Sequence, residues 1–140
     1  MNVKNQNGNK KKRILLAEGF DPSKKVMTEI LKLLGWEYDT VNNGYDVILA
    51  LKNKSFDLLL LDLELPQLDG FETIEHIRRK LEFPINTIPV MAMINRDFSS
   101  DFNQTYKDEG FDEIIVKPFS IDELDRKIKE LFYRKNPLFA

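Results

Sequence analysis

The sequence contains no cysteine and only one histidine, His76, among its 140 residues. The absence of cysteine excludes disulfide bonds, thiolate metal sites and cysteine nucleophiles, and it fits a reducing compartment such as the cytoplasm. His76 lies off the apolar face of its expected helix, with no second histidine or partner motif, which is typical of a surface residue rather than a catalyst or phosphate carrier. These absences reduce the number of catalytic and metal-binding mechanisms that the chain could use.

Charge of one sign and long apolar runs are also lacking. The chain has 21 basic and 23 acidic residues and a net charge of −2, so it has no general field that favours nucleic acid. No run approaches the ~20 apolar residues that a membrane-spanning helix needs, and the N-terminus lacks an apolar segment of signal-peptide length. We therefore expect a cytoplasmic protein with no membrane span and no direct contact with nucleic acid.

The length and the apolar content of 42% fit one folded domain. We expect residues 1–12 to form a disordered basic tail, residues 13–133 to form the domain, and residues 134–140 to form a short C-terminal tail. The run Lys10–Arg13 is typical of a solvated arm; binding to nucleic acid or an anionic membrane is the alternative interpretation.

The stretch 56–70 provides the predicted central strand and the first candidate functional residue. Its four leucines, Leu58–Leu61, are too few for a membrane span and too uniformly apolar for a half-exposed strand, so they predict a strand buried on both faces. Asp62 stands where this strand ends. In doubly wound sheets, ligands bind in the crevice outside the carboxyl ends of the strands, which makes Asp62 a candidate functional residue. The alternative is that Asp62 only caps a turn.

Short apolar strands alternate with amphipathic helices along the whole chain. In the first expected helix, Asp21 is placed as the N-cap, and Val26, Ile30, Leu33 and Leu34 form the apolar stripe. The expected strands are 14–17, 36–41, 58–61, 89–94 and 114–116, and the expected helices are 21–34, 45–52, 70–81, 97–109 and 120–132. This alternation predicts the α/β class: a single-domain, doubly wound αβα sandwich with a five-stranded parallel sheet and right-handed crossovers.

The fourth expected helix, 97–109, is polar apart from Phe98, Phe102 and Tyr106, which are spaced four apart. Residues at this spacing share one helix face. They are interpreted as the core face of the helix, and a stripe that binds a partner is the alternative.

Three polar residues follow the first, third and fifth strands: Glu18, Asp62 and Lys117. Parallel strands bring their carboxyl ends together, so these side chains are expected to converge. Two carboxylates form a hard oxygen site that suits Mg²⁺ with several waters and a phosphate oxygen. A lysine can pair with phosphate, and an aspartate between a cation and a lysine can accept a phosphoryl group.

The residues around these positions resemble the receiver domain of bacterial two-component response regulators. The resemblance rests on Glu18, on Asp62 with Pro66 and Asp69–Gly70, and on Lys117–Phe119. It covers nearly the whole chain, from about residue 13 to residue 132. It implies a flavodoxin-like topology with strand order 2-1-3-4-5.

The resemblance also implies a role for each residue. Asp62 would accept a phosphoryl group from a histidine kinase or a phosphotransfer protein, and Lys117 would contact that group. Glu18, Asp62 and the backbone carbonyl of Glu64 would bind Mg²⁺. A downstream protein target would then read a change in the face formed by residues 97–132.

The chain departs from the family pattern at several of these positions. Gly19 replaces the second of two adjacent acids, so we expect weak Mg²⁺ binding. Ile94 replaces a threonine or serine whose hydroxyl bonds the phosphoryl oxygen, and Ile114 replaces the switching aromatic residue. Asn95 follows Ile94, and its amide either replaces the lost donor in part or crowds the pocket or forms a turn.

We therefore interpret the chain as a stand-alone, atypical response regulator that is phosphorylated on Asp62 and signals through protein contacts, with a homodimer left open. It would not be an enzyme beyond self-catalysed phosphoryl transfer and autodephosphorylation. The alternative is a pseudo-receiver, a protein-interaction module that works without phosphorylation. A third interpretation, an α/β enzyme or flavin-binding protein, has less support because the loops lack a glycine-rich phosphate cradle and a nucleophile–base pair.

Overall fold

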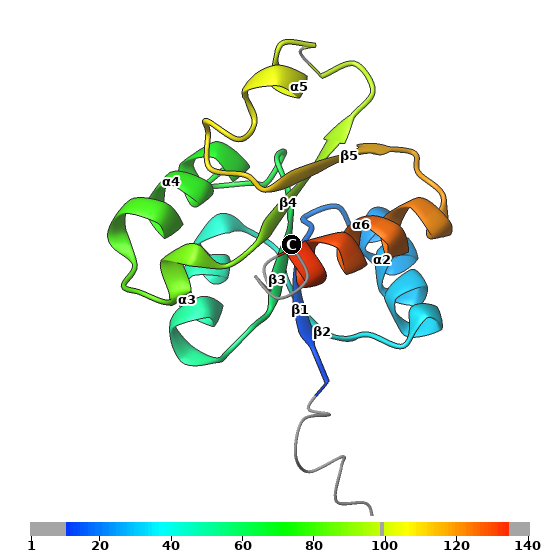
Figure 1. The fold of residues 1–140 in the computed structure, drawn as a ribbon, viewed down its shortest axis with the longest axis horizontal. Coiled ribbons are helices and arrows are strands. Elements are labelled where there is room, and N and C mark those ends of the chain that lie inside the picture. The colour runs from blue at the N-terminus through cyan, green and yellow to red at the C-terminus, as the bar shows by residue number, and fades with distance from the viewer. Residues whose placement is uncertain (1–10, 99, 135–140) are drawn as a thin grey trace, which may run out of the picture.

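The computed structural model describes residues 11–98 and 100–134. Five parallel strands form one sheet in the order β2-β1-β3-β4-β5 (Figure 1). The strands are β1 (Arg13–Ala17), β2 (Glu37–Val41), β3 (Leu58–Asp62), β4 (Val90–Asn95) and β5 (Glu113–Lys117). The predicted strand order, parallel sheet and fold class are confirmed.

Helices cover both faces of the sheet, as Figure 1 shows. One layer contains α2 (Asp21–Leu34) and α6 (Ile121–Arg134), and the other contains α3 (Gly44–Asn53), α4 (Gly70–Lys80) and the short α5 (Phe102–Thr105). A 3₁₀ turn, η1 (Ile85–Thr87), precedes β4. The helix α6 ends at Arg134, two residues beyond the expected helix end at residue 132.

The central strand β3 is buried along its whole length, as predicted. Leu58 and Leu60 pack in the core beside α2 and α6, whereas Leu59 and Leu61 pack in the core beside α3 and α4. This alternation follows from the two-residue period of a strand between two helical layers. Asp62 is thereby fixed at the carboxyl edge of the sheet.

Two details of the prediction for α2 were wrong. Asp21 is the first helical residue and not the N-cap, which is Phe20, and no side chain caps the helix. The buried residues are Met27 and Leu31, while Val26 and Leu33 are 56% and 73% exposed. Ile30 of the predicted stripe is partly buried and packs against the same core. The face that packs against the sheet is therefore centred on Met27 and Leu31 and includes only part of the predicted stripe.

The predicted helix 97–109 was wrong in extent, because only Phe102–Thr105 is helical. The surrounding Ser, Asp and Asn residues favour turns over helix interiors. Phe102 is buried, and Phe98 and Tyr106 pack against the same core, which supports their interpretation as a core face. Phe98 also stacks on Phe71 of α4, with ring centroids 6.1 Å apart.

No helix among the described residues is long and apolar enough to cross a membrane. The sequence segments 1–10 and 135–140, which include most of the predicted tails, lie outside the residues that the structure describes.

Arg78 connects α4 to the loops before β4 and β5. Its Nη1 donates to the carbonyl oxygens of Asn86 (2.9 Å) and Ile88 (2.8 Å), and its Nε donates to that of Gly110 (2.9 Å). Its Nη2 forms an ion pair of 3.1 Å with Asp112. One guanidinium therefore satisfies three backbone carbonyls and one carboxylate from two loops, one 8–10 residues and the other 32–34 residues away in the sequence.

The substitution Arg78→Ala should lower the free energy of unfolding by about 2 kcal/mol, because it removes the ion pair to Asp112 and takes the side-chain donor from three backbone carbonyls, while Asp112 keeps its hydrogen bond from the amide of Val90. Its neighbour provides the control: Arg79 is 76% exposed, so Arg79→Ala should change stability by less than about 0.5 kcal/mol. Urea unfolding of both variants measures the difference. Equal effects would show that the Arg78 contacts do not stabilise the fold.

Candidate functional site

Three polar side chains converge at the carboxyl edge of the sheet. Glu18 directly follows β1, Asp62 ends β3 and Lys117 ends β5. The ammonium Nζ of Lys117 lies 2.9 Å from Oδ2 of Asp62 and 3.1 Å from Oε1 of Glu18. The predicted convergence of these three residues is therefore present in the structure.

Both carboxylates are largely buried and are held by backbone amides as well as by the lysine. Glu18 is 1% exposed, and its Oε2 accepts a hydrogen bond of 3.3 Å from the amide of Phe20. The side chain of Asp62 is 10% exposed, and its Oδ1 accepts a hydrogen bond of 2.8 Å from the amide of Glu64. Asp62 thus forms the kind of turn considered as the alternative interpretation while its second oxygen faces Lys117.

The turn at Asp62 is the alternative that the sequence offered, whereas the contact of Glu18 with the amide of Phe20 was not expected. Each contact joins a carboxylate to the amide two residues further along the chain, a local geometry that aspartate commonly adopts and that Glu18 forms here with a longer side chain. The spacing of Asp62 and Glu64 is therefore a signal that could have predicted one contact. Both fix the carboxylates before any ligand binds.

Burial and the interactions among Glu18, Asp62 and Lys117 shift the pKa values of Glu18 and Lys117. Burial raises the pKa of Glu18, and hydrogen bonding with Asp62 and the negative charge of Asp62 raise it further, against the opposing effect of Lys117. Burial alone would lower the pKa of Lys117, but its hydrogen bonds and charge attraction to Asp62 and Glu18 outweigh burial, and the pKa is raised. The lysine therefore stays charged between the two acids.

Gly19 stands beside Glu18 in a tight position. A Cβ atom there would lie 2.8 Å from Cδ of Pro66 and 3.0 Å from the carbonyl oxygen of Asn42. The loop after β3 also contains Gln67, a non-glycine residue with a positive φ of 67°. A longer side chain at position 19 would thus have to displace the loop that carries Pro66.

The end of β4 presents a branched apolar side chain to this edge of the fold. Ile94 is 5% exposed, and the next residue, Asn95, is exposed and pairs in register with Lys117. Ile114 of β5 is half-buried and packs against the core beside α3 and α4. Neither isoleucine has a hydroxyl group that could donate a hydrogen bond.

The donor set fits Mg²⁺ in part. Within residues 11–98 and 100–134, no group of three or more His, Cys, Asp or Glu side chains is arranged to hold a metal ion. The two adjacent carboxylates of Glu18 and Asp62 are nevertheless hard oxygen ligands, and Mg²⁺ commonly uses one or two carboxylates and keeps several waters.

Because the pKa of Glu18 is raised, the unfolding free energy of the protein should depend on pH. The folded protein holds a proton on Glu18 more tightly than the unfolded chain does, so ionisation of Glu18 lowers stability at neutral pH, and this cost disappears below the ordinary value of 4.5. In metal-free buffer, Glu18→Gln should therefore raise the unfolding free energy at pH 7, and the gain should vanish towards pH 4. Glu64→Gln, at an exposed acid, is the control. A loss of stability at pH 7 would contradict this assignment.

Comparison with known proteins places the chain in a family. Residues 14–129 match the response regulator receiver domain. The chain is 32% identical over 123 residues to a CpxR homologue of Haemophilus influenzae, a transcriptional regulatory protein, and the match covers 87% of this chain and 51% of that one. It is 28% identical over 134 residues to the probable transcriptional regulator ycf27 of Cyanidium caldarium, covering 96% and 51%. The chain thus spans about half the length of these curated relatives.

Solved structures share the fold. A putative response regulator from Chloroflexus aurantiacus superposes with a TM-score of 0.80 at 20% identity, covering 88% of this chain and 98% of that chain. The receiver domain of a sensor histidine kinase from Pseudomonas aeruginosa, which has a magnesium ion coordinated in its active-site cleft, gives a TM-score of 0.78 at 24% identity, with 88% and 98% covered. This chain belongs to the response regulator receiver domain family of two-component signalling.

Proposed function

We propose that this receiver domain accepts a phosphoryl group on Asp62 from a histidine kinase or a phosphotransfer protein and passes the signal on through protein contacts. One observation carries the proposal: a buried aspartate carboxylate shares a charged lysine with a second carboxylate. Phosphoryl transfer depends mostly on positioning and on neutralising charge, and this arrangement supplies both.

In the proposed step, a carboxylate oxygen of Asp62 attacks the phosphorus of a phosphohistidine. A phosphorus–oxygen bond forms, the phosphorus–nitrogen bond breaks, and the imidazole leaves with the electron pair. Lys117 moves its ammonium group from the free carboxylate to an oxygen of the phosphoryl group. The amide of Glu64 continues to orient the Asp62 side chain.

Glu18, Asp62 and the backbone carbonyl of Glu64 would hold Mg²⁺, which when bound supplies positive charge opposite the phosphoryl oxygens. We propose that this binding is weak. Affinity for a hard cation follows ligand charge, and Gly19 provides none at the position where a third carboxylate would stand. The crowding by Pro66 described above keeps that position small.

The surface beside the site supports an approach by a protein donor. Phe20 and Val26 are 63% and 56% exposed next to the edge that carries Glu18. Ile30 and Phe119 line a neighbouring hollow of about 340 Å³ that reaches Lys117. An apolar rim around a charged centre suits a docked protein, because the rim excludes water from the transferred group.

For the output, we propose that a downstream protein target reads the face formed by residues 97–132, in a cytoplasmic protein whose receiver domain makes no direct contact with nucleic acid, with homodimerisation open. Asn95 is the last residue of β4, and Phe98 lies in the following loop, where its ring stacks on Phe71 of α4. The amide of Phe98 donates to the carbonyl of Asn95 at 3.0 Å. Because Ile94 and Ile114 cannot supply the hydroxyl and aromatic switch residues, we expect a smaller or differently routed response.

A second candidate is a pseudo-receiver that binds partners without phosphorylation. The specific observation in its favour is that both oxygens of Asp62 already have donors and that only 10% of its side chain is exposed. The isoleucine at position 94 favours it too, because a phosphoryl oxygen near it would lack a hydroxyl donor.

Intact-mass analysis with Mg²⁺ and a small acyl phosphate distinguishes the two candidates. The proposal predicts an added mass of one phosphoryl group that is lost in Asp62→Asn and in EDTA, because both the nucleophile and the cation are needed. Asp108→Asn, at an exposed turn residue outside the site, should be labelled like the unchanged protein.

Labelling on a residue other than Asp62 would refute the assignment of the acceptor. An absence of labelling, together with no change in the NMR signals of the Asp62 and Glu64 amides on addition of beryllofluoride and Mg²⁺, would favour the pseudo-receiver.

A further inference from the structure

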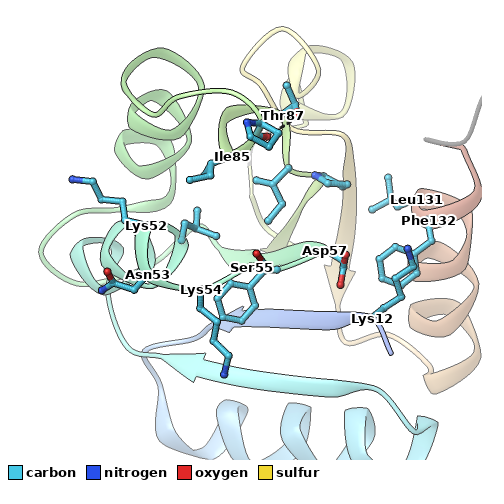
Figure 2. A pocket seen from close by; sticks show the side chains of 15 residues that line it. Lys12, Lys52, Asn53, Lys54, Ser55, Asp57, Ile85, Thr87, Leu131 and Phe132 are labelled. Atoms are coloured by element: carbon cyan, nitrogen blue, oxygen red, sulfur yellow. Dashed lines mark hydrogen bonds between the residues drawn. The ribbon is translucent and has the colours of Figure 1, made fainter. Parts of the chain in front are cut away.

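A hollow lies at the amino edge of the sheet, opposite the acidic site. Its lining includes residues directly before three strands: Lys12 before β1, Asp57 before β3 and Pro89 before β4. The last turn of α3 and the end of α6 complete it, as Figure 2 shows. Its volume is about 690 Å³, within the range of about 300–1,000 Å³ that is usual for small-molecule sites.

The rim of this hollow is cationic although the whole chain is slightly acidic. Lys12, Lys52 and Lys54 line it, against one carboxylate, that of Asp57. Asp57 already accepts a hydrogen bond of 2.8 Å from the amide of Arg13. In the part of the chain that the structure describes, neither Lys12 nor Lys52 has a carboxylate within ion-pair distance.

A second hollow of about 730 Å³ adjoins this rim and shares Lys12, Lys54, Ser55 and Asp57 with it. It adds Lys11 and the ion pair between Arg13 and Glu37, so Lys11 is the further cation that this hollow contributes. Lys54 forms an ion pair of 2.9 Å with Asp39, but half of its side chain is exposed, so this pair binds it only weakly. The ammonium groups of Lys12, Lys52 and Lys54 can therefore bind an anion.

One wall of the first hollow is apolar and partly aromatic. Phe132 stands beside Lys12 in Figure 2, and the Lys12 ammonium lies 5.4 Å from the centroid of its ring. Leu131, Ile85 and Phe56 also line the hollow. Apolar lining with a few polar groups that fix orientation is the usual character of a ligand site.

We propose that this hollow binds a nucleotide, with the phosphates on the lysine rim and the base against the apolar wall. Phosphates pair with cations such as the lysines of the rim, a flat base packs on an apolar surface, and the hydroxyl of Ser55, which also lines the hollow, adds a polar group. A concave site of this size favours a small ligand over a nucleic acid or a membrane surface. The site is separate from Asp62, so it does not depend on the proposed phosphorylation.

The single tryptophan provides a direct readout. Trp36 packs edge-on against Phe132, with ring centroids 5.3 Å apart, so a base that contacts Phe132 changes the surroundings of the indole. Titration with ATP in EDTA, with excitation beyond the absorption of adenine, should give a saturable fluorescence change. EDTA keeps divalent cations away from the acidic site at the opposite edge.

Lys12→Gln should weaken ATP binding by about fivefold, the effect of one exposed ion pair, and Lys12→Gln with Lys54→Gln by about 20-fold. Lys32→Gln is the matched control, because Lys32 is an exposed lysine of α2 outside both hollows, and it should leave the affinity unchanged. Phe132→Leu should weaken binding of ATP more than binding of tripolyphosphate in a calorimetric titration, since only ATP has a base.

Three results would overturn the proposal. They are the absence of saturable ATP binding at millimolar concentration, equal affinities for ATP and tripolyphosphate, and tighter lysine-dependent binding of duplex DNA or anionic vesicles than of ATP.

Discussion

Two carboxylates buried at one edge of a sheet need a cation between them, and in this protein Lys117 provides it. Burial and mutual repulsion raise the pKa of Glu18, and the ion pairs with both acids keep Lys117 charged despite its own burial. The three residues come from positions 18, 62 and 117, so only the finished parallel sheet brings them together. The same contacts that make Asp62 a candidate nucleophile therefore depend on the whole fold.

The site keeps the three residues that the family resemblance pointed to, but the residues around them differ from the family pattern. Asp62, Lys117 and Glu18 are in place, but Gly19 leaves one acidic position empty and Pro66 lies against it. At the end of β4, Ile94 provides no hydroxyl group that could donate a hydrogen bond. Under the proposed function, this site would neutralise a phosphoryl group with fewer ligands, and phosphorylation would be coupled less strongly to a conformational response. The hollow lined by Lys12, Lys52 and Lys54 lies at the opposite edge of the sheet.

Much of this could be predicted from the sequence, because short apolar runs that alternate with helices specify a parallel sheet, and strand ends specify where polar residues meet. The inward face of α2 could not be chosen, since two sets of apolar residues have helical spacing and only packing decides between them. The contacts of Arg78 were missed because they join loops 32 and 34 residues away in the sequence. Gly19 was identified from the family pattern, but its contact with Pro66 depends on the tertiary structure.

The role of Lys117 can be tested by the pH titration of its side chain, followed by NMR in the metal-free protein with the signal assigned from Lys117→Arg. We expect a pKa above the ordinary value of 10.5, because Asp62 and Glu18 both favour the ammonium form, and a lower pKa in Asp62→Asn. A pKa at or below the ordinary value, or one that does not respond to Asp62→Asn, would contradict the claim that Lys117 holds these two carboxylates together.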